Sequence, residues 1–566
     1  MDNGQGRDRE HQILGGRPMS RREFFKMAGI AGAVVGIGGG LSGLLAACGG
    51  STTTTAASAT TASTTAAATG STTGAAAGAA SGSLVFPKDT FTEATKTVTT
   101  ADGDKEIAYR LYKHLTYVAN PVDANYQSLD VSVPTKIAGT AVDASNAPIL
   151  FDIGVGGYMS SANTADGSSS GTKGAPGGGA LPSGGTPPSG MTGTPPAGAG
   201  GGMGGMVSNA DLALAAGYVV VSPGCRGRDN KDSSGKYYGK APAAIVDLKA
   251  AVRYVKSNKG VIPGNTDWII SNGTSAGGAL SSLLAASGDS DLYTSYLKGL
   301  GAADASDAIF GCAAFCPITD LAHADTAYEW QFGAVPASNA TVDQSLSKQL
   351  ADAFATYQAS LDIQGVNGFG ALTADNYGDY LLKTYLVPAA NKYLATLSDT
   401  DRQSYLAKNT FITWGNNAAS FSFADYSKHC GRMKTLPAFD AFDLSAAENN
   451  EFGNETTDAS HFTEFSLQHE KGSSAKLDSD LPDRIDMMNP MYFVTKKNPG
   501  AAGNYWIRYG TSDSNTSLPV IANLAAGMAT IGKNVNSLMY WDAGHGANQD
   551  AADFIKWVAS TTAYSK

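Results

Sequence analysis

The residues best suited to chemistry lie where an apolar run meets a Gly-x-Ser-x-Gly motif. Residues 268–271 read Trp-Ile-Ile-Ser and lead into Gly273-Thr-Ser275-Ala-Gly277, after which residues 279–286 have a helical pattern. A serine hydroxyl is a poor nucleophile unless a sharp turn between a strand and a helix holds it out of the chain. This context predicts Ser275 as a nucleophile, with the backbone N–H of Ala276 donating to the oxyanion.

A second copy of the motif, Gly167-Ser-Ser169-Ser-Gly171, tests how specific the first one is. The chain has 68 glycines among 566 residues, so a chance match is expected. The second copy lies in a run rich in Gly, Ser and Pro, with no apolar strand before it. We therefore interpret Ser169 as a loop residue.

Two apolar runs near the C-terminus each open into a residue that a serine nucleophile needs. Residues 505–509 lead into Asp513, and residues 537–541 lead into Asp542-Ala-Gly-His545. In hydrolases with such an elbow, the nucleophile, acid and histidine follow in this chain order, each on a loop after a strand. We predict His545 as the general base and Asp513 as the acid that orients it, and we expect the rival acid, Asp542, to cap its own loop.

A glycine-rich loop is the candidate for the second oxyanion donor. Residues 148–153 form an apolar run that ends in Gly154-Val-Gly156-Gly157-Tyr158. Glycine lets the backbone approach a ligand closely, so an N–H of Gly156 or Gly157 is the expected donor, with an ordinary turn as the alternative. The cysteines lack metal-ligand spacing, and we expect neither a metal nor a cofactor. Cys312 and Cys316 lie in an apolar run that favours buried packing, and a disulfide among Cys225, Cys312, Cys316 and Cys430 stays open.

The N-terminus has the pattern of an export and anchoring signal. Ser20-Arg21-Arg22-Glu-Phe24-Phe25-Lys26 is a close twin-arginine match, and a Gly- and Ala-rich apolar stretch follows it. The stretch ends in Leu45-Ala-Ala-Cys48, which is typical of a lipoprotein cleavage box. We expect residues 1–48 to be the signal and Cys48 to carry lipid outside the cytoplasm; a transmembrane helix is the alternative. Residues 49–84, rich in Ser, Thr, Ala and Gly, would be a flexible linker.

Residues 85–566 are long enough for a large catalytic domain. Strand-like and helical runs alternate at residues 218–222, 244–256 and 268–271, which predicts an α/β fold with a mostly parallel sheet. The stretch between Ser275 and Asp513 is far longer than the connection requires, so we place a lid insertion at about 319–488. Residues 163–206 are nearly all Gly, Pro, Ser, Thr and Ala and are expected to be a disordered loop. The net charge of −10, without a basic cluster in the mature part, argues against a nucleic-acid partner.

From about residue 90 to the C-terminus, the chain resembles the bacterial tannase-like (subtype B) α/β-hydrolases, a group that overlaps with feruloyl-esterase-like enzymes. The resemblance implies the α/β-hydrolase fold and ester hydrolysis. It rests on Gly154-Val-Gly-Gly-Tyr158, Gly224-Cys-Arg-Gly-Arg228, Gly273-Thr-Ser-Ala-Gly-Gly278, Cys316-Pro-Ile-Thr-Asp-Leu321 with Ala327-Tyr-Glu-Trp330, Met433-Lys-Thr-Leu-Pro-Ala-Phe-Asp440, Glu448-Asn-Asn-Glu-Phe-Gly453 and Gly510-Thr-Ser-Asp513.

The same resemblance implies a set of substrate contacts. In bacterial tannases a lysine and a glutamate of the lid, with an aspartate two residues past the triad acid, bind the galloyl hydroxyls. These positions are Lys434, Glu448 and Asn515 here, and the amide at 515 departs from the family pattern. The cysteine pair that flanks the catalytic residues of fungal tannases is absent, since Asn272 and Gly544 stand there. An ion pair on the lid surface is the alternative for Lys434 and Glu448.

Together these features predict a membrane-anchored extracytoplasmic hydrolase of small aromatic acyl esters. The rivals among enzymes are a feruloyl esterase or general carboxylesterase and a peptidase of the same fold. A substrate-binding surface lipoprotein without turnover is the rival from another class, but a binding module needs no activated serine.

Lipidation of Cys48 is testable directly. Cys48→Ser removes the thiol that would accept the lipid, so we expect a precursor that is unprocessed or released from the membrane. Mass spectrometry of the mature N-terminus measures this. An N-terminus far from residue 48, without lipid mass, contradicts the prediction.

Overall fold

A computed structural model describes residues 83–163, 208–337 and 341–564. The predicted signal, Cys48, nearly all of the linker, Ser169 and the Gly/Pro-rich loop from residue 164 onward lie outside the described residues. Asn163, where we began that loop, is held in place, because its side chain donates to Ser128 O at 3.1 Å and to Ser222 O at 3.0 Å. Among the helices described, none combines the length and apolarity needed to cross a bilayer.

A ten-stranded sheet organises the molecule in the order β1-β2-β3-β6-β5-β7-β8-β13-β14, with β4 paired to β3. From β6 to β14 all neighbours are parallel, whereas β1, β2, β3 and β6 pair antiparallel. Apart from the edge strand β14, the parallel strands are almost continuously buried, as expected for a sheet covered on both faces. The predicted α/β fold with a mostly parallel sheet is thereby confirmed. The strands are β1 Thr92–Thr100, β2 Gly103–Thr116, β3 Ser128–Ile137, β4 Thr140–Ala141, β5 Ile149–Ile153, β6 Val219–Pro223, β7 Ile269–Thr274, β8 Gly311–Phe315, β13 Asn504–Gly510 and β14 Asn534–Tyr540.

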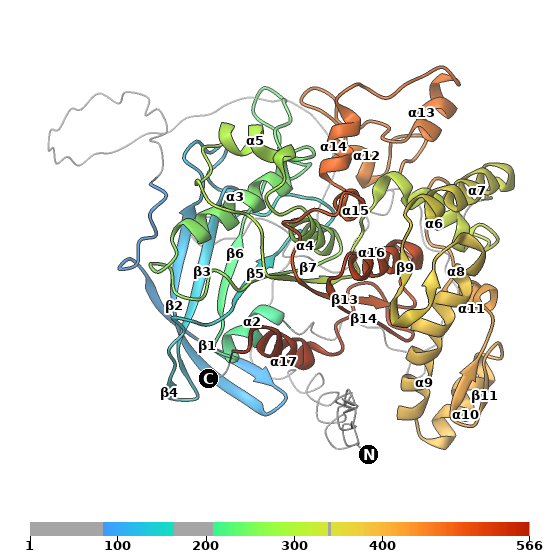
Figure 1. The fold of residues 1–566 in the computed structure, drawn as a ribbon, viewed down its shortest axis with the longest axis horizontal. Helices are drawn as coiled ribbons and strands as arrows, with labels where there is room; N and C mark the ends of the chain where they lie inside the picture. Colours follow the sequence, from blue (N-terminus) through green and yellow to red (C-terminus); the bar gives the residue numbers. More distant parts are fainter. Residues whose placement is uncertain (1–82, 164–207, 338–340, 565–566) are drawn as a thin grey trace, which may run out of the picture. The chain divides into compact units, whose positions relative to one another are not determined.

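Helices cover the two faces of the sheet unequally (Figure 1). One face carries the larger core, to which Val219 and Val221 of β6 contribute, and Val220 between them contributes to the smaller core on the other face. This alternation follows from the period of two in a strand. The larger core is closed by α3 Ala243–Ser257, α4 Ala276–Ala286, α15 Pro490–Thr495 and α16 Leu518–Thr530, with η1 Asp291–Tyr293 and α5 Thr294–Gly299 beside them; α2 Asn209–Ala215 and α17 Ala551–Thr562 close the smaller one.

A long insertion connects β8 to α15, in the place where the sequence predicts a lid. Its two ends are joined at the sheet, because Asn489 donates from Nδ2 to Asp320 Oδ1 at 2.8 Å. The insertion contains α6 Leu321–Phe332, α7 Gln344–Ser360, β9 Gln364–Gly365, η2 Val366–Gly368, β10 Gly370–Ala371, α8 Ala374–Leu381, η3 Leu382–Leu386, α9 Val387–Thr396, α10 Asp399–Lys408, β11 Thr413–Gly415, β12 Ala418–Ser420, α11 Phe423–Cys430, α12 Ala447–Glu451, α13 Glu464–Lys471 and α14 Leu481–Met487.

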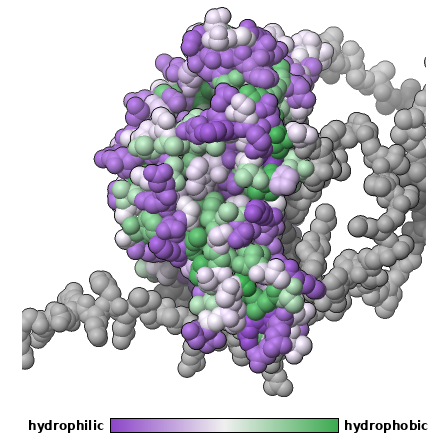
Figure 2. Space-filling model, turned by 90° about the vertical axis from the view of Figure 1, so that its right-hand side faces the viewer, coloured by the Kyte–Doolittle hydropathy of each residue, from purple (hydrophilic) through white to green (hydrophobic). Residues whose placement is uncertain are grey.

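Aromatic side chains build the interior of the insertion. The Trp330 ring lies 5.1 Å from that of Phe354, 5.7 Å from that of Tyr377 and 5.3 Å from that of Phe423, which joins α6, α7, α8 and α11. Figure 2 shows the side of the molecule that carries these helices, where hydrophilic residues are interspersed with narrower apolar areas. The large rings thus pack inward and make the insertion a structured part of the domain.

A buried carboxylate fixes the loops of the insertion that carry Glu448. Asp440 is fully buried and accepts hydrogen bonds from Asn449 Nδ2 at 2.6 Å, His461 Nδ1 at 2.7 Å and Thr463 N at 2.7 Å. Burial acts to lower the pKa of His461, but the bond to Asp440 outweighs it and the pKa is raised. The position of α12 therefore depends on a charge-assisted network rather than on helix propensity.

Candidate active site

Ser275 occupies the turn between β7 and α4 with a backbone conformation that few residues adopt. Its φ is 61° and its ψ is −123°, outside the ordinary wells of an L-residue. The N–H of Ser275 donates to Phe315 O at 2.9 Å, and its carbonyl accepts from Ala279 N at 2.9 Å. The sheet and the first turn of α4 thus hold the strained residue from both sides.

The two glycines of the motif are required by the same turn. A Cβ on Gly273 would lie 2.3 Å from Gly277 O, and a Cβ on Gly277 would lie 2.8 Å from both Ile153 O and Val155 O. These contacts involve backbone, which cannot yield as the end of a flexible side chain can. The strand, turn and helix expected around Ser275 are therefore present, and the spacing of the motif has a steric cause.

The loop expected to complete the oxyanion site lies beside the elbow. Gly277 N donates to Val155 O at 3.0 Å, which places the start of the 154–158 loop against α4. Within the described chain, the N–H groups of Ala276, Gly156 and Gly157 have no hydrogen-bond partner in the protein. These are the three donors that the sequence indicates for an oxyanion.

Asp513 and His545 meet as predicted for an acid–base pair. His545 Nδ1 lies 2.7 Å from Asp513 Oδ2, and the side chains are 10% and 0% exposed. Both follow the carboxyl ends of adjacent parallel strands, β13 and β14, on the same edge of the sheet as the end of β7. No direct hydrogen bond joins the described side chains of Ser275 and His545, a contact that commonly tightens only when substrate binds.

The hydrogen bond to Asp513 changes the basicity of the histidine. Burial acts to lower the pKa of His545, but the bond to Asp513 and the contact with Cys316 outweigh it, and the pKa lies above its usual range. A carboxylate that stabilises the imidazolium makes the ring a stronger proton acceptor.

The other candidate acid, Asp542, is engaged elsewhere. Its carboxylate accepts from His429 Nε2 at 2.7 Å and from the Tyr405 hydroxyl, and Ser512 Oγ lies at 3.4 Å. His429 and Tyr405 belong to the insertion, so Asp542 joins the insertion to the histidine loop. We expected it to cap its own loop, and that expectation missed this long-range role.

Lys434 and Glu448 lie together in the insertion, with Lys434 Nζ 4.0 Å from Glu448 Oε1. The ammonium also lies 3.6 Å from the centre of the Phe439 ring, a cation–π contact. Their side chains are 20% and 11% exposed, so they do not form a freely solvated surface pair.

Tyr328 connects Lys434 to the loop of the acid. Its hydroxyl accepts from Lys434 N at 3.1 Å and donates to Ser514 O at 3.0 Å, and Ser514 follows Asp513. Sequence reasoning gave Tyr328 no role, although it lies within one of the motifs that carry the family resemblance.

Arg228 connects Glu448 to the oxyanion loop in a similar way. Its Nε donates to Gly157 O at 2.6 Å, and its NH1 donates to Asn450 Oδ1 at 2.9 Å in α12, the helix that carries Glu448. The two insertion residues are thus joined to different loops, Lys434 to the loop of Asp513 and Glu448 to the 154–158 loop.

Asn515, the third position implied for substrate binding, contacts the predicted acid. Its backbone N and side-chain Nδ2 donate to Asp513 Oδ1 at 2.9 and 3.1 Å. The amide thus orients the carboxylate oxygen that does not face His545, a role that the carboxylate of an aspartate would not fill.

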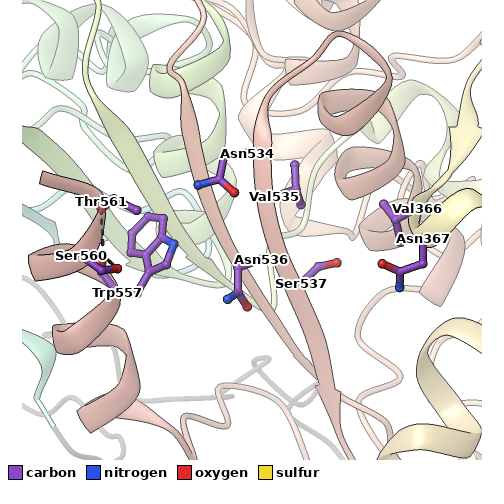
Figure 3. Close-up of a pocket in the computed structure, with 9 residues that line it drawn as sticks. All are labelled: Val366, Asn367, Asn534, Val535, Asn536, Ser537, Trp557, Ser560 and Thr561. Atoms are coloured by element: carbon purple, nitrogen blue, oxygen red, sulfur yellow. Dashed lines mark hydrogen bonds between the residues drawn. The ribbon is translucent and has the colours of Figure 1, made fainter. Parts of the chain in front are cut away.

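A separate recess of about 380 Å³ lies at the edge strand β14 (Figure 3). None of the predicted site residues lines it. Its walls come from η2, β14 and α17 and comprise Val366, Asn367, Asn534, Val535, Asn536, Ser537, Trp557, Ser560 and Thr561.

Comparison with known proteins places this geometry among ester hydrolases. The BD-FAE family model matches residues 201–364. The native tannin acyl hydrolase of Lactobacillus plantarum has 33% identity and a TM-score of 0.69, covering 84% of this chain and 98% of its own. The Fusobacterium nucleatum tannase has 34% identity and a TM-score of 0.68, covering 85% and 99%. A tannin acyl hydrolase in complex with ethyl gallate has 33% identity and a TM-score of 0.68, covering 84% and 98%. No curated protein matches the chain.

The role of Asp513 is tested by Asp513→Asn, which keeps the shape but removes the charge. We expect kcat to fall by about 10³–10⁴, because an amide favours the wrong imidazole tautomer. A general base acts in its neutral form, so we expect activity to rise with pH through the raised pKa of His545. Losing the carboxylate lowers that pKa, and the acid limb of kcat/KM should move to lower pH.

Asp542→Asn is the matched control, since it removes a nearby carboxylate that does not contact His545. It should leave the acid limb in place. A larger loss in this variant than in Asp513→Asn would show that the acid is misassigned.

Proposed function

This chain belongs to the tannase-like family of α/β-hydrolases, and from that premise we propose that it cleaves aromatic acyl esters of the galloyl type through Ser275, His545 and Asp513. The observation that carries the proposal is the buried Asp513–His545 pair, at 2.7 Å, on the sheet edge where β7 ends in the strained Ser275. A backbone conformation of that kind is retained where function requires it.

The geometry supports a two-stage acyl transfer. His545 accepts the proton of the Ser275 hydroxyl as its Oγ attacks the ester carbonyl, and Asp513 stabilises the imidazolium. The negative oxygen receives hydrogen bonds from Ala276 N–H and from Gly156 or Gly157 N–H. His545 then protonates the departing alcohol, and water releases the acid from Ser275 by the reverse sequence.

The acyl group is proposed from the charge of the insertion beside the triad. An ammonium and a carboxylate 4.0 Å apart can each hydrogen-bond a phenolic hydroxyl, which suits a galloyl ring. The resemblance to a tannin acyl hydrolase that binds ethyl gallate supports this choice.

A feruloyl esterase or a general carboxylesterase is the second candidate. The observation that favours it is the amide of Asn515, which donates to Asp513 and brings no charge to the third phenolic position. The BD-FAE match supports the same reading. A binding lipoprotein without turnover is disfavoured, because nothing in ligand binding needs the strained Ser275.

We further propose that the enzyme works outside the cytoplasm, anchored by lipid at Cys48. The support is the twin-arginine pattern followed by Leu45-Ala-Ala-Cys48, and the Ser-, Thr- and Ala-rich linker after it. A linker of this composition lets a folded domain stand away from the membrane surface.

The nucleophile is tested by Ser275→Ala. We expect kcat to fall by about 10⁴ or more, since the loss of one member disables the triad. Labelling by a fluorophosphonate probe should disappear in the same variant. Ser169→Ala, which alters the other copy of the motif, should leave turnover and labelling unchanged, and a comparable loss in both variants would rule out Ser275 as the sole nucleophile.

The acyl specificity is tested by Lys434→Ala and Glu448→Ala with methyl gallate, methyl ferulate and p-nitrophenyl acetate. The phenolic hydroxyls do not react, so their contacts contribute mainly to binding. We expect KM for methyl gallate to rise by an amount equivalent to about 1–3 kcal/mol, with a smaller change in kcat.

p-Nitrophenyl acetate lacks those hydroxyls and should hardly respond to either substitution. Equal effects on gallate and acetate esters would make the pair structural and the enzyme a carboxylesterase. Asn515→Asp separates the two candidates further. It restores the charge that the family brings to the galloyl ring, so turnover of methyl gallate should improve if the enzyme is a tannase, although the variant also loses a donor to Asp513.

A further inference from the structure

Cys316 follows β8 at the point where that strand passes between the nucleophile and the acid. Its φ is 45°, and its N–H donates to Arg508 O of β13 at 2.7 Å. The carbonyl of the preceding residue, Phe315, accepts from Ser275 N at 2.9 Å, and Ile318 N donates to Ser275 O at 3.4 Å. The short segment 315–318 therefore holds the backbone of Ser275 at both its N–H and its carbonyl.

The thiol of Cys316 points to the histidine side of the site. Gly546 N donates to Cys316 Sγ at 3.2 Å. The sulfur, a carboxylate oxygen of Asp513 and a ring nitrogen of His545 all lie within 4.8 Å of one another. One fully buried residue thus touches both halves of the catalytic arrangement.

Among the described residues, the loop of His545 has further contacts on both sides of the ring, and Ala543 O accepts from Ser512 N at 2.9 Å. Asp542 N donates to Thr511 Oγ1 at 2.8 Å at the beginning, and Asn548 Nδ2 donates to Asn209 Oδ1 at 2.9 Å at the end. Between these points, Asp513 holds the ring of His545 and Cys316 Sγ holds the backbone of Gly546. Removing the sulfur would release the backbone directly beside the base.

We propose that Cys316 is a positioning residue that sets the distance and direction between Ser275 and His545. Its backbone segment hydrogen-bonds to Ser275, and its thiol accepts from the backbone of Gly546, next to His545. The inference rests on the proposed serine mechanism and adds to it a residue that reacts with nothing.

The thiol suits this role because it stays uncharged. Burial raises the pKa of Cys316, so the sulfur remains protonated beside Asp513 and His545 rather than adding a second negative charge. A protonated, buried thiol is also a poor nucleophile, which separates this residue from Ser275.

The test compares Cys316→Ala, Cys316→Ser and Cys312→Ala in the full chain, with p-nitrophenyl acetate as substrate. Cys312 is the matched control, because it lies on β8, the strand that Cys316 follows, and is also fully buried but lies outside the group formed by Cys316, Asp513 and His545. EDTA is included in every assay, since the Cys316, Asp513 and His545 atoms could otherwise capture a soft divalent cation.

We expect Cys316→Ala to lower kcat by about 10- to 100-fold with little change in KM, because a small misplacement of reacting groups has an effect of that order. Asp513 and Cys316 are the titratable groups that face His545, and both raise its pKa, the carboxylate by its hydrogen bond and its charge and the protonated thiol as a hydrogen-bond partner of the ring. The acid limb of kcat/KM should therefore move to lower pH in Cys316→Ala. Cys316→Ser, which keeps an acceptor for Gly546 N, should recover part of kcat and of the pH limb.

Cys312→Ala should lower the melting temperature about as much as Cys316→Ala does. It should leave kcat and the acid limb of kcat/KM unchanged. Equal kinetic losses in the two alanine variants, or an unshifted limb in both Cys316 variants, would overturn the proposal. If Cys316→Ala does not fold, Cys316→Ser decides, because wild-type kcat and an unshifted limb in that variant refute it. Activity remaining in Ser275→Ala would instead refute the proposed function, whereas an inactive Ser275→Ala with a fully active Cys316→Ala refutes this inference alone.

Discussion

The left-handed turn at Ser275 is the constraint on which the rest of the site depends. A residue with a Cβ at φ 61° is unfavourable by itself, so the neighbours must determine it. They do so by close backbone contact, since Gly273 and Gly277 leave no room for a side chain and Phe315 O accepts the N–H of Ser275. The strain places the hydroxyl at the carboxyl edge of the sheet, beside the loops that follow β13 and β14.

The insertion is attached at the same edge of the sheet. Asp320 and Asn489 join its ends, Tyr328 joins it to the acid loop, and Arg228 joins it to the oxyanion loop. Asp542, which lies three residues before His545, accepts hydrogen bonds from two side chains of the insertion, His429 and Tyr405. The loops of Asp513 and His545 therefore share hydrogen bonds with the insertion directly, and the 154–158 loop is joined to it through Arg228.

Much of the site could be predicted from the sequence because it follows from local rules. The strand, turn and helix around Ser275 require a fixed spacing of small residues, and polar residues that end apolar runs, such as Asp513 and His545, meet at one edge when the strands are parallel. The mostly parallel sheet itself is determined by alternating runs of period 2 and 3.6. These patterns involve residues close together in the chain, so they can be recognised without knowing what packs against them.

The remaining features were decided by tertiary structure, because each depends on a partner far away in the chain. Sequence treated Cys316 as a buried hydrophobe, and its burial was correct, but its bond to Gly546 spans 230 positions. Asn515 differs from an aspartate only in its amide group. That amide donates a hydrogen bond to Asp513, a contact that only the folded position of Asp513 makes possible. The sequence favours Asp513 over Asp542 as the acid, and the tertiary structure adds their partners, since Asp513 faces His545 whereas Asp542 faces His429 of the insertion. Composition and spacing determine which groups are available to the site, whereas packing decides which of them face one another.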